Sequence, residues 1–246
     1  MRAYQPTLDF HRLIALGLPD EDGQDWADAN RGFIGCIDDT EVKTADGKPV
    51  WSLKGYGFLD DGKAADTVNP SLWRQARLNR IHGLFEVTPR MFQVRGYDIA
   101  NITFIEGDTG LIALDALTTP DTAAAALALY RKHRDPDGKR RLHTVMYSHS
   151  HGDHFGGVAG LCTQAQVDVG EVNIIAPSGF MHHAVAENVI HWRGRSICTW
   201  RCTATARAVM WCWRSTTGQC GAMRRCASSS PSSVICTACC TTRPYA

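Results

Sequence analysis

An apolar segment that runs directly into a cluster of histidines limits the fold of this chain more than any other feature. Residues 142–147 have the pattern of a short buried strand, and the next ten residues read SHSHGDHFGG. Sheets of α/β proteins place their chemistry in loops at the carboxyl ends of such strands. The pattern therefore predicts an α/β domain with a functional loop at one edge of its sheet.

The segments before this loop agree with an α/β fold. Asn69 and Pro70 are typical of the first residues of a helix, which we expect to stop at Gly83. The pattern further predicts strands at 91–97, 102–106 and 111–114, and a helix at 121–133. A helix that links two parallel strands must cover one face of their sheet, so a layered α/β domain is expected.

The histidine-rich loop holds four candidate metal ligands within six residues: His149, His151, Asp153 and His154. His149 and His151 lie two positions apart in an extended segment, so both rings can leave on one side. Gly152 allows a sharp turn that would carry the other two toward a second, nearby position. Imidazoles with a carboxylate suit zinc, and two ions about 3.5–4 Å apart generate hydroxide near neutral pH. The alternative is a polar surface loop without a ligand.

This loop and its surroundings resemble the metallo-β-lactamase superfamily, and more closely the linear primary alkylsulfatases, which hydrolyse esters of the dodecyl sulfate type. The resemblance covers about residues 20–190. It is carried by residues 67–75, 83–87, 93–98 with Asn101, 147–158 and parts of 175–189. It implies a metallo-β-lactamase-like αββα sandwich, incomplete within this chain.

The resemblance also implies roles for individual residues. His149 and His151 would bind one zinc ion, and Asp153 and His154 would bind a second. Asp153 would also help to hold the bridging hydroxide that attacks the sulfate ester, which releases an alcohol and sulfate. Asp115, after the strand at 111–114, resembles an acid that orients groups of the loop from behind the metals. An ordinary strand-end aspartate that accepts backbone N–H bonds explains Asp115 equally well.

Several parts that the family implies are missing from this chain. Family members carry further acidic ligands and a downstream histidine ligand, then a helical dimerisation domain and a lipid-carrier-like domain. We therefore expect an incomplete second zinc site, no dimerisation region for the family homodimer, and a truncated, inactive chain as printed. The HxHxDH motif identifies the metals and not the leaving group, so another ester or thioester hydrolase stays open. An inert metal-binding fragment is a further alternative.

Residues 191–246 differ in composition from residues 1–190. They contain no Asp, Glu, Lys, Leu or Phe, yet they hold eight of the ten Cys, four of the seven Trp and eight Arg. Ordinary domains do not lack leucine over such a length. We expect the N-terminal part of a catalytic domain over 1–190 and an aberrant, disordered tail over 191–246, the product of a coding sequence read in a shifted frame.

Two other interpretations of this tail are weaker. A zinc or redox module around Cys236, Cys239 and Cys240 lacks recurring CxxC pairs. An arm that binds nucleic acid through Arg and Trp lacks clustered charge. The tail leaves 18 of the 26 basic residues and all 25 acidic ones to the first 190, so no nucleic-acid partner is expected. The partner that the resemblance implies is a small alkyl sulfate.

The chain shows neither a signal peptide nor an apolar run of about 18 residues. We therefore expect no membrane span and a cytoplasmic location as printed, although full-length relatives can be periplasmic or secreted. A helix is predicted at 179–190, on which His182 and His183 are expected to be solvent or helix-face residues rather than ligands. Glu187 lies on the same helix at a distance from the loop that the sequence does not fix. Cys162 is expected to be a buried, small apolar side chain.

Overall fold

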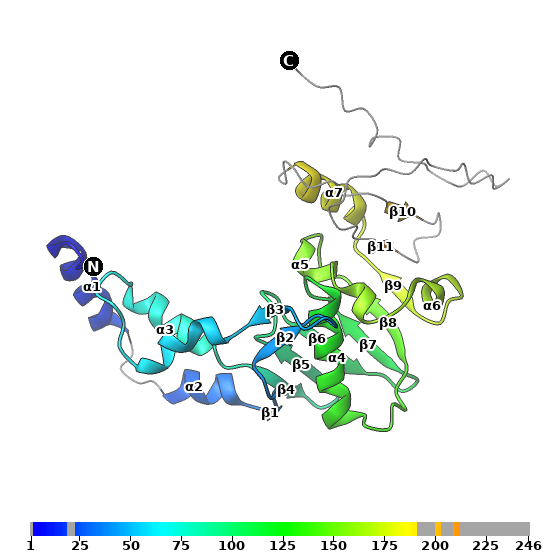
Figure 1. Cartoon of the computed structure of the whole chain (residues 1–246), viewed down its shortest axis with the longest axis horizontal. Coiled ribbons are helices and arrows are strands. Elements are labelled where there is room, and N and C mark those ends of the chain that lie inside the picture. The colour runs from blue at the N-terminus through cyan, green and yellow to red at the C-terminus, as the bar shows by residue number, and fades with distance from the viewer. Residues whose placement is uncertain (1, 19–22, 191–199, 203–208, 212–246) are drawn as a thin grey trace, which may run out of the picture.

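The computed structural model describes residues 2–18, 23–190, 200–202 and 209–211. Its centre is a seven-stranded sheet in the order β1-β4-β5-β6-β7-β8-β9 (Figure 1). The pairs from β1 to β7 are antiparallel, whereas β7, β8 and β9 run parallel. The strands are β1 Phe33–Gly35, β4 Gly83–Thr88, β5 Met91–Arg95, β6 Ile102–Glu106, β7 Leu111–Leu114, β8 Leu142–Met146 and β9 Asn173–Ile175. The predicted α/β class is confirmed.

Helix α4 (Pro120–Arg134) connects the parallel strands β7 and β8 and covers one face of the sheet (Figure 1). It begins at a capping box, in which the Thr119 side chain accepts a hydrogen bond from the Thr122 backbone N–H. Its buried face includes two alanines, and its Tyr130 ring lies 4.9 Å from the ring of Phe104 on β6. The predicted helix at 121–133 is thus confirmed, with one more residue at each end.

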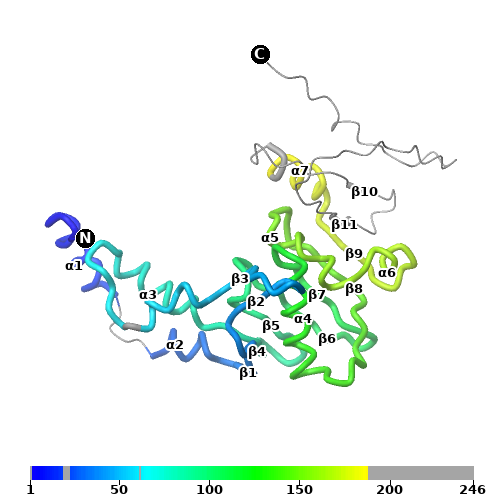
Figure 2. Tube along the Cα trace, viewed as in Figure 1, coloured from blue at the N-terminus to red at the C-terminus, as the bar shows by residue number. Residues whose placement is uncertain are grey.

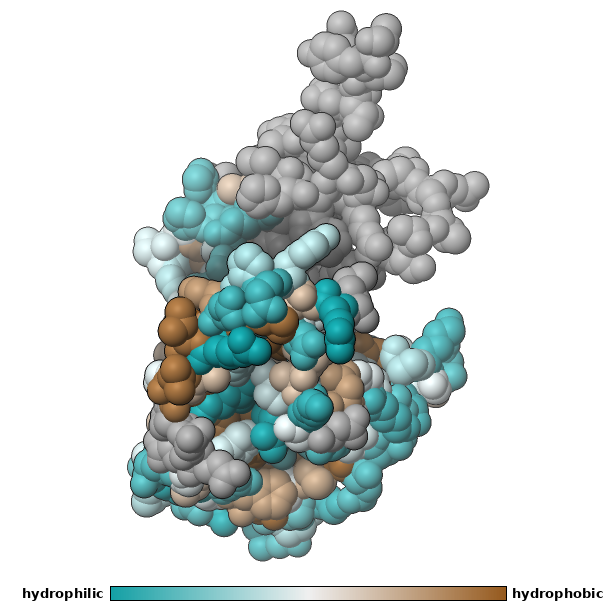
Figure 3. Space-filling model, turned by 90° about the vertical axis from the view of Figure 1, so that its left-hand side faces the viewer, coloured by the Kyte–Doolittle hydropathy of each residue, from teal (hydrophilic) through white to brown (hydrophobic). Residues whose placement is uncertain are grey.

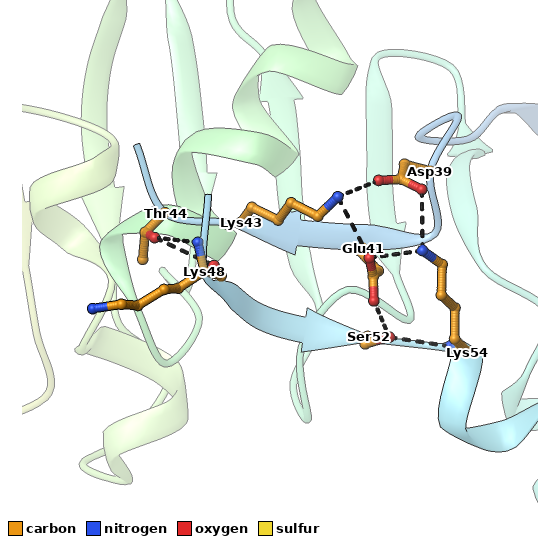
Figure 4. Close-up of polar contacts among 7 residues, drawn as sticks. All are labelled: Asp39, Glu41, Lys43, Thr44, Lys48, Ser52 and Lys54. Atoms are coloured by element: carbon orange, nitrogen blue, oxygen red, sulfur yellow. Dashed lines mark hydrogen bonds and ion pairs between the residues drawn. The ribbon is translucent and has the colours of Figure 1, made fainter. Parts of the chain in front are cut away.

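The hairpin of β2 (Glu41–Lys43) and β3 (Pro49–Ser52) packs against α4 and carries a network of ion pairs (Figure 4). The Lys54 ammonium lies 2.7 Å from a Glu41 carboxylate oxygen and 3.3 Å from one of Asp39. Hydrogen bonds from lysine hold the pKa of both carboxylates below the ordinary value. Asp39, Lys43 and Lys54 are exposed and only the Glu41 side chain is largely covered, so solvent screens most of this network and it contributes little to stability.

An arm of helices extends from the β1 end of the sheet (Figures 1 and 2). It contains α1 (Gln5–Gly17), α2 (Gly23–Asn30), η1 (Lys54–Asp61) and α3 (Pro70–Asn79). No residue of α1, α2 or α3 is buried. Apolar side chains such as Phe10 and Leu13 on α1 stay exposed. Figure 3 views the molecule from the side of the arm and shows apolar residues among the polar ones. The core that supports the sheet therefore lies outside the arm.

Helix α3 shows one prediction confirmed and one that was wrong. The Asn69 side chain accepts from the Ser71 N–H and caps the helix, as expected. Gly83 does not end it, because α3 ends at Asn79 and Gly83 begins β4 with a φ of 139°. A side chain there would press against the Gly35 carbonyl of β1, so the glycine serves strand pairing.

The segment after β8, through residue 190, contains four helices and the strand β9, which lies between the third and the fourth helix. Its helices are α5 Gly152–Phe155, η2 Val158–Gly160, α6 Gln164–Asp168 and α7 Phe180–Ile190. The helix predicted at 179–190 and the burial of Cys162 are confirmed. Among the helices of the described residues, none is long and apolar enough to cross a membrane.

The segment 191–246 is described at six residues alone. These form β10 (Trp200–Cys202) and β11 (Val209–Trp211), which pair antiparallel. The disorder expected for the tail and the idea of a module around Cys236, Cys239 and Cys240 concern residues outside the described ones.

Candidate functional site

The histidine-rich loop begins where three parallel strands end. Leu114 at the end of β7 pairs with Met146 at the end of β8, and the Asp115 N–H donates to the Met146 carbonyl at 2.7 Å. On the other side, the Tyr147 N–H donates to the Ile175 carbonyl of β9 at 2.9 Å. The loop is thus fixed at the carboxyl edge of the sheet, where the sequence predicted it.

Asp115 connects the end of β7 to two residues of the loop. Its Oδ1 accepts from the Ser148 N–H, and its Oδ2 accepts from the Ser148 hydroxyl, both at 2.8 Å. The same Oδ2 lies 2.8 Å from His154 Nδ1. Asp115 is buried and has a φ of +66°. Both interpretations of Asp115 from the sequence therefore fit its contacts. It accepts a backbone N–H bond, as an ordinary strand-end aspartate does, and it also faces a candidate metal ligand from behind.

The structure brings the four candidate metal ligands together. His149 Nε2 lies 2.9 Å from His151 Nδ1, so these rings leave the loop on one side as expected. The next residues form the single helical turn α5, which carries Asp153 and His154 back toward them. The rings of His149 and His154 lie 4.0 Å apart between centroids, and His154 Nε2 lies 3.3 Å from Asp153 Oδ2.

Each of the three imidazoles has one nitrogen facing another candidate ligand and the other facing an outer oxygen. The outer contacts are His149 Nδ1 to Ser148 Oγ at 2.9 Å, His154 Nδ1 to Asp115 Oδ2 at 2.8 Å and His151 Nε2 to Glu187 Oε2 at 3.8 Å. Proteins orient metal-binding histidines in this way. Within the described part of the chain, however, no three His, Cys, Asp or Glu side chains are placed to hold one metal ion together.

Close backbone packing explains the two glycines that end the motif. The Gly157 N–H donates to the Leu117 carbonyl at 2.9 Å, and a Cβ on Gly157 would lie 2.2 Å from the Ala116 carbonyl oxygen. A Cβ on Gly156 would lie 2.4 Å from the Thr118 carbonyl oxygen. Because no side chain fits in these gaps, the loop can press against the segment that follows β7.

The decisive comparison is with protein families. Residues 95–193, which include β6, β7, α4, β8 and the whole loop, match the family model of the metallo-β-lactamase superfamily. Residues 95–193 belong to that superfamily. The αββα type of fold expected for this domain is thereby supported by an independent comparison.

Relatives of this metallo-β-lactamase domain are named as sulfatases. The chain is 50% identical over 184 residues to an alkyl/aryl-sulfatase of Saccharomyces cerevisiae, which covers 75% of this chain and 28% of the yeast protein. It is 48% identical over 174 residues to a linear primary-alkylsulfatase of a Pseudomonas species, over 70% of this chain and 25% of that protein. Members of the group are thus sulfuric ester hydrolases by name.

A solved structure extends the match to the fold. The stereoselective inverting sec-alkylsulfatase Pisa1 from a Pseudomonas species superposes with a TM-score of 0.70 at 50% sequence identity. The match covers 77% of this chain and 29% of that chain. The chain therefore spans less than a third of the length of each of these relatives.

An aromatic cluster lies beneath the loop of the metallo-β-lactamase domain. The Tyr147 ring lies 5.9 Å from the Phe155 ring and 5.3 Å from the Phe180 ring, and all three residues are buried. This burial raises the pKa of the Tyr147 phenol. The cluster joins the end of β8, α5 and α7, so the loop packs on a base of buried aromatic rings.

A pocket of about 140 Å³ lies between the loop and the start of α7. It is lined by Ser148, His149, Ser150, Pro177, Ser178, Phe180 and His183. His183 is exposed, as expected, but it lines this pocket, which the sequence did not predict. His182 is also exposed and makes a ring contact with His183.

The sequence left the position of Glu187 relative to the loop undecided. Helix α7 brings its carboxylate to within 3.2 Å of the Ser150 hydroxyl, which donates to it. The pairing joins residues 37 positions apart. A helical pattern fixes which residues share a face, but it does not fix where the helix docks, so no sequence signal could have found this contact.

Proposed function

We propose that this chain is the metal-binding part of a hydrolase that cleaves alkyl sulfate esters to an alcohol and sulfate. The observation that carries the proposal is the orientation of the three histidines of the loop. Each ring turns one nitrogen toward another candidate ligand and the other nitrogen toward an oxygen of Ser148, Asp115 or Glu187. The sulfatase names of the relatives support the substrate class. Linear primary esters such as dodecyl sulfate are the proposed substrates.

The donor set of the loop fits divalent metal ions, and we propose zinc. His149 and His151 would hold one ion, and Asp153 and His154 would contribute to a second. Two nitrogens on one tetrahedral zinc lie about 3.3 Å apart, close to the 2.9 Å between His149 Nε2 and His151 Nδ1. When bound, such ions supply Lewis acidity and lower the pKa of water.

The residues of the chain itself would position this chemistry. Asp115 holds His154 from behind through Nδ1, which leaves Nε2 on the side of Asp153. Asp153 is the proposed catalytic carboxylate, and its side chain is one-quarter exposed, so substrate can approach it. The pocket beside His149 offers hydroxyl groups and apolar walls, which suit the junction between a sulfate group and an alkyl chain.

We expect less than two equivalents of zinc and little turnover from the chain as printed. The described residues do not place three donors around one point. A site with two protein ligands leaves the remaining positions to water and binds weakly. The same observation favours the second candidate, a metal-binding fragment without activity.

The preference for a primary ester is tested by comparing three substrates. Purified chain with zinc is incubated with dodecyl sulfate, a secondary octyl sulfate and an aryl sulfate, and released sulfate is measured by ion chromatography. The proposal predicts slow release, greatest for dodecyl sulfate, that a chelator and His149→Ala both abolish. Release that survives both treatments would contradict a metal-dependent reaction, whereas zinc binding without release would favour the inert fragment.

We also propose that the sequence of the catalytic domain continues only to about residue 190 and that residues 191–246 come from a shifted reading frame. The family match ends at residue 193, which supports this boundary. The test is to translate the other two frames of the coding DNA after codon 190. Alkylsulfatase-like sequence that resumes in one frame supports the proposal, and its absence from both contradicts it.

A further inference from the structure

Glu187 contacts the metal-binding loop at other residues than Asp115 does. It lies on α7, which is drawn close to α5 of the loop in Figure 1 and contacts the loop through Ser150. The Ser150 hydroxyl lies 3.3 Å from Oε1 and 3.2 Å from Oε2 of Glu187, so the carboxylate accepts a bond from the residue between His149 and His151. A helix distant in sequence thus holds the centre of the motif.

The same carboxylate faces the outer nitrogen of His151. Nδ1 of His151 is the nitrogen that faces His149, at 2.9 Å. Nε2 is therefore the nitrogen on the far side of the ring, and it lies 3.8 Å from Glu187 Oε2. This distance is longer than a hydrogen bond, and a small movement of either side chain would bring the two atoms within hydrogen-bond reach. Glu187 is therefore outside the ligand set and behind one of its members.

Asp115 shows what such a carboxylate does. It holds a serine of the loop, Ser148, and at the same time faces the outer nitrogen of His154. Glu187 likewise accepts a bond from a loop serine, Ser150, and faces the outer nitrogen of a loop histidine, His151, although at 3.8 Å rather than the 2.8 Å of the Asp115 contact. The loop is therefore contacted by two carboxylates, one at the end of β7 and one on α7.

We propose that Glu187 is a positioning residue for metal binding: it anchors the loop through Ser150 and directs Nδ1 of His151 toward the metal by engaging Nε2. This inference rests on the proposed function. A carboxylate that accepts from the outer N–H of a histidine fixes its orientation and raises its basicity as a ligand. Loss of such partners costs about 10–100-fold in metal affinity. Because Glu187 is 38% exposed, we expect the lower end of this range.

The test separates the anchoring contact from the contact with His151. Zinc affinity of the full chain is measured by competition with a chromophoric chelator, and hydrogen exchange of residues 148–154 is measured without metal. Glu187→Gln retains an oxygen for Ser150 but loses the carboxylate charge. It is expected to keep the protection of the loop and to bind zinc about tenfold more weakly. Glu187→Ala is expected to lose both the hydrogen-exchange protection of the loop and zinc affinity.

The matched control is Glu171→Gln, which changes an exposed glutamate before β9 and is expected to alter neither measurement. Wild-type zinc affinity in both Glu187 variants would overturn the role of Glu187 and leave the proposed function intact. Wild-type loop protection and wild-type zinc affinity in Glu187→Gln, with both lost in Glu187→Ala, would reduce Glu187 to an anchor and overturn the His151 part. A wild-type chain that binds no zinc would overturn the proposed function and this inference together.

Discussion

Asp115 Oδ2 lies 2.8 Å from His154 Nδ1, which joins the end of β7 to the last histidine of the motif across 39 positions of sequence. The contact does not depend on a metal ion, because the Asp115 carboxylate is already held by two hydrogen bonds from Ser148. Asp115 therefore ties the loop to the sheet edge through one buried side chain, in addition to the backbone hydrogen bonds between these segments.

Replacement of Asp115 tests this arrangement. Asp115→Ala leaves the Ser148 N–H without its acceptor and places alanine at a φ of +66°. We expect the free energy of unfolding to fall by about 2–4 kcal/mol, measured by urea denaturation. Asp115→Asn tolerates that φ and keeps one oxygen, so it is expected to lose less. Equal stability of Asp115→Ala and the wild type would contradict the role of Asp115 in holding the loop.

Asp98 fixes the segment against which the loop packs. Its two oxygens accept from the Ile99 and Thr118 backbone N–H groups and from the hydroxyls of Thr118 and Thr122, at 2.6–3.0 Å. Asp98→Ala removes all four acceptor contacts in a buried site, and we expect a loss of about 3 kcal/mol in urea denaturation. The control Asp108→Ala, whose side chain is 90% exposed, should change stability by at most about 0.5 kcal/mol.

Gly157 should not tolerate a side chain. A Cβ there would lie 2.2 Å from the Ala116 carbonyl oxygen, which is backbone and cannot move aside cheaply. Gly157→Ala is expected to destabilise the chain by about 2–3 kcal/mol or more, read as a lower midpoint of thermal unfolding. The control Gly57→Ala enters open space and should leave the midpoint nearly unchanged. A stable Gly157→Ala chain would mean that the loop is packed less tightly than the structure has it.

Stability should fall in alkaline solution. Burial raises the pKa of the Cys162 thiol from 9.0 to about 11 and that of the Tyr97 phenol from 10.0 to about 12. Both groups ionise more readily in the unfolded chain, so their contribution is complete below pH 9 and is lost as the pH rises through 11 and 12. The loss is at most about 1.4 kcal/mol per pH unit for each group.

Urea denaturation at pH 8, 9.5 and 10.5 under reducing conditions measures this effect. The free energy of unfolding should be lower at each step above pH 9. Cys162→Ala should flatten the first part of the decline, because the alanine does not ionise. A wild-type profile that stays level to pH 10.5 would be at odds with burial of these two groups.

Zinc should stabilise the chain through the histidine loop. A ligand that binds the folded form alone raises the unfolding free energy by RT ln(1 + [L]/Kd), about 2.7 kcal/mol at one hundred times Kd. We expect a higher unfolding temperature with zinc, reversed by a chelator, and less than two equivalents retained after gel filtration. His149→Ala and His151→Ala should remove the shift, whereas His182→Ala, at an exposed position of α7, should keep it.

Retention of two tightly held zinc ions would contradict the expectation of an incomplete site. It would mean that residues not recognised as ligands complete the coordination. A zinc-induced shift that persists in His149→Ala and His151→Ala would place the ion elsewhere in the chain.

Local patterns in the sequence determined much of the domain. The strands at 102–106 and 111–114 have the predicted bounds, and Asn69 caps the predicted helix. These features depend on hydrogen bonds and apolar alternation among neighbours a few positions apart, which a sequence displays directly. The HxHxDH spacing likewise places His149 and His151 side by side, because alternate residues of an extended segment share a face.

Only the tertiary structure decided what surrounds the loop. Asp115 meets Ser148 because β7 and β8 run parallel and end together. Glu187 meets Ser150 because α7 packs through its first residue, Phe180, against Tyr147 and Phe155. These pairs are 33 and 37 positions apart. Contacts over such distances follow from how whole elements pack, a property of the buried surfaces of several elements at once, which no local pattern along the chain encodes.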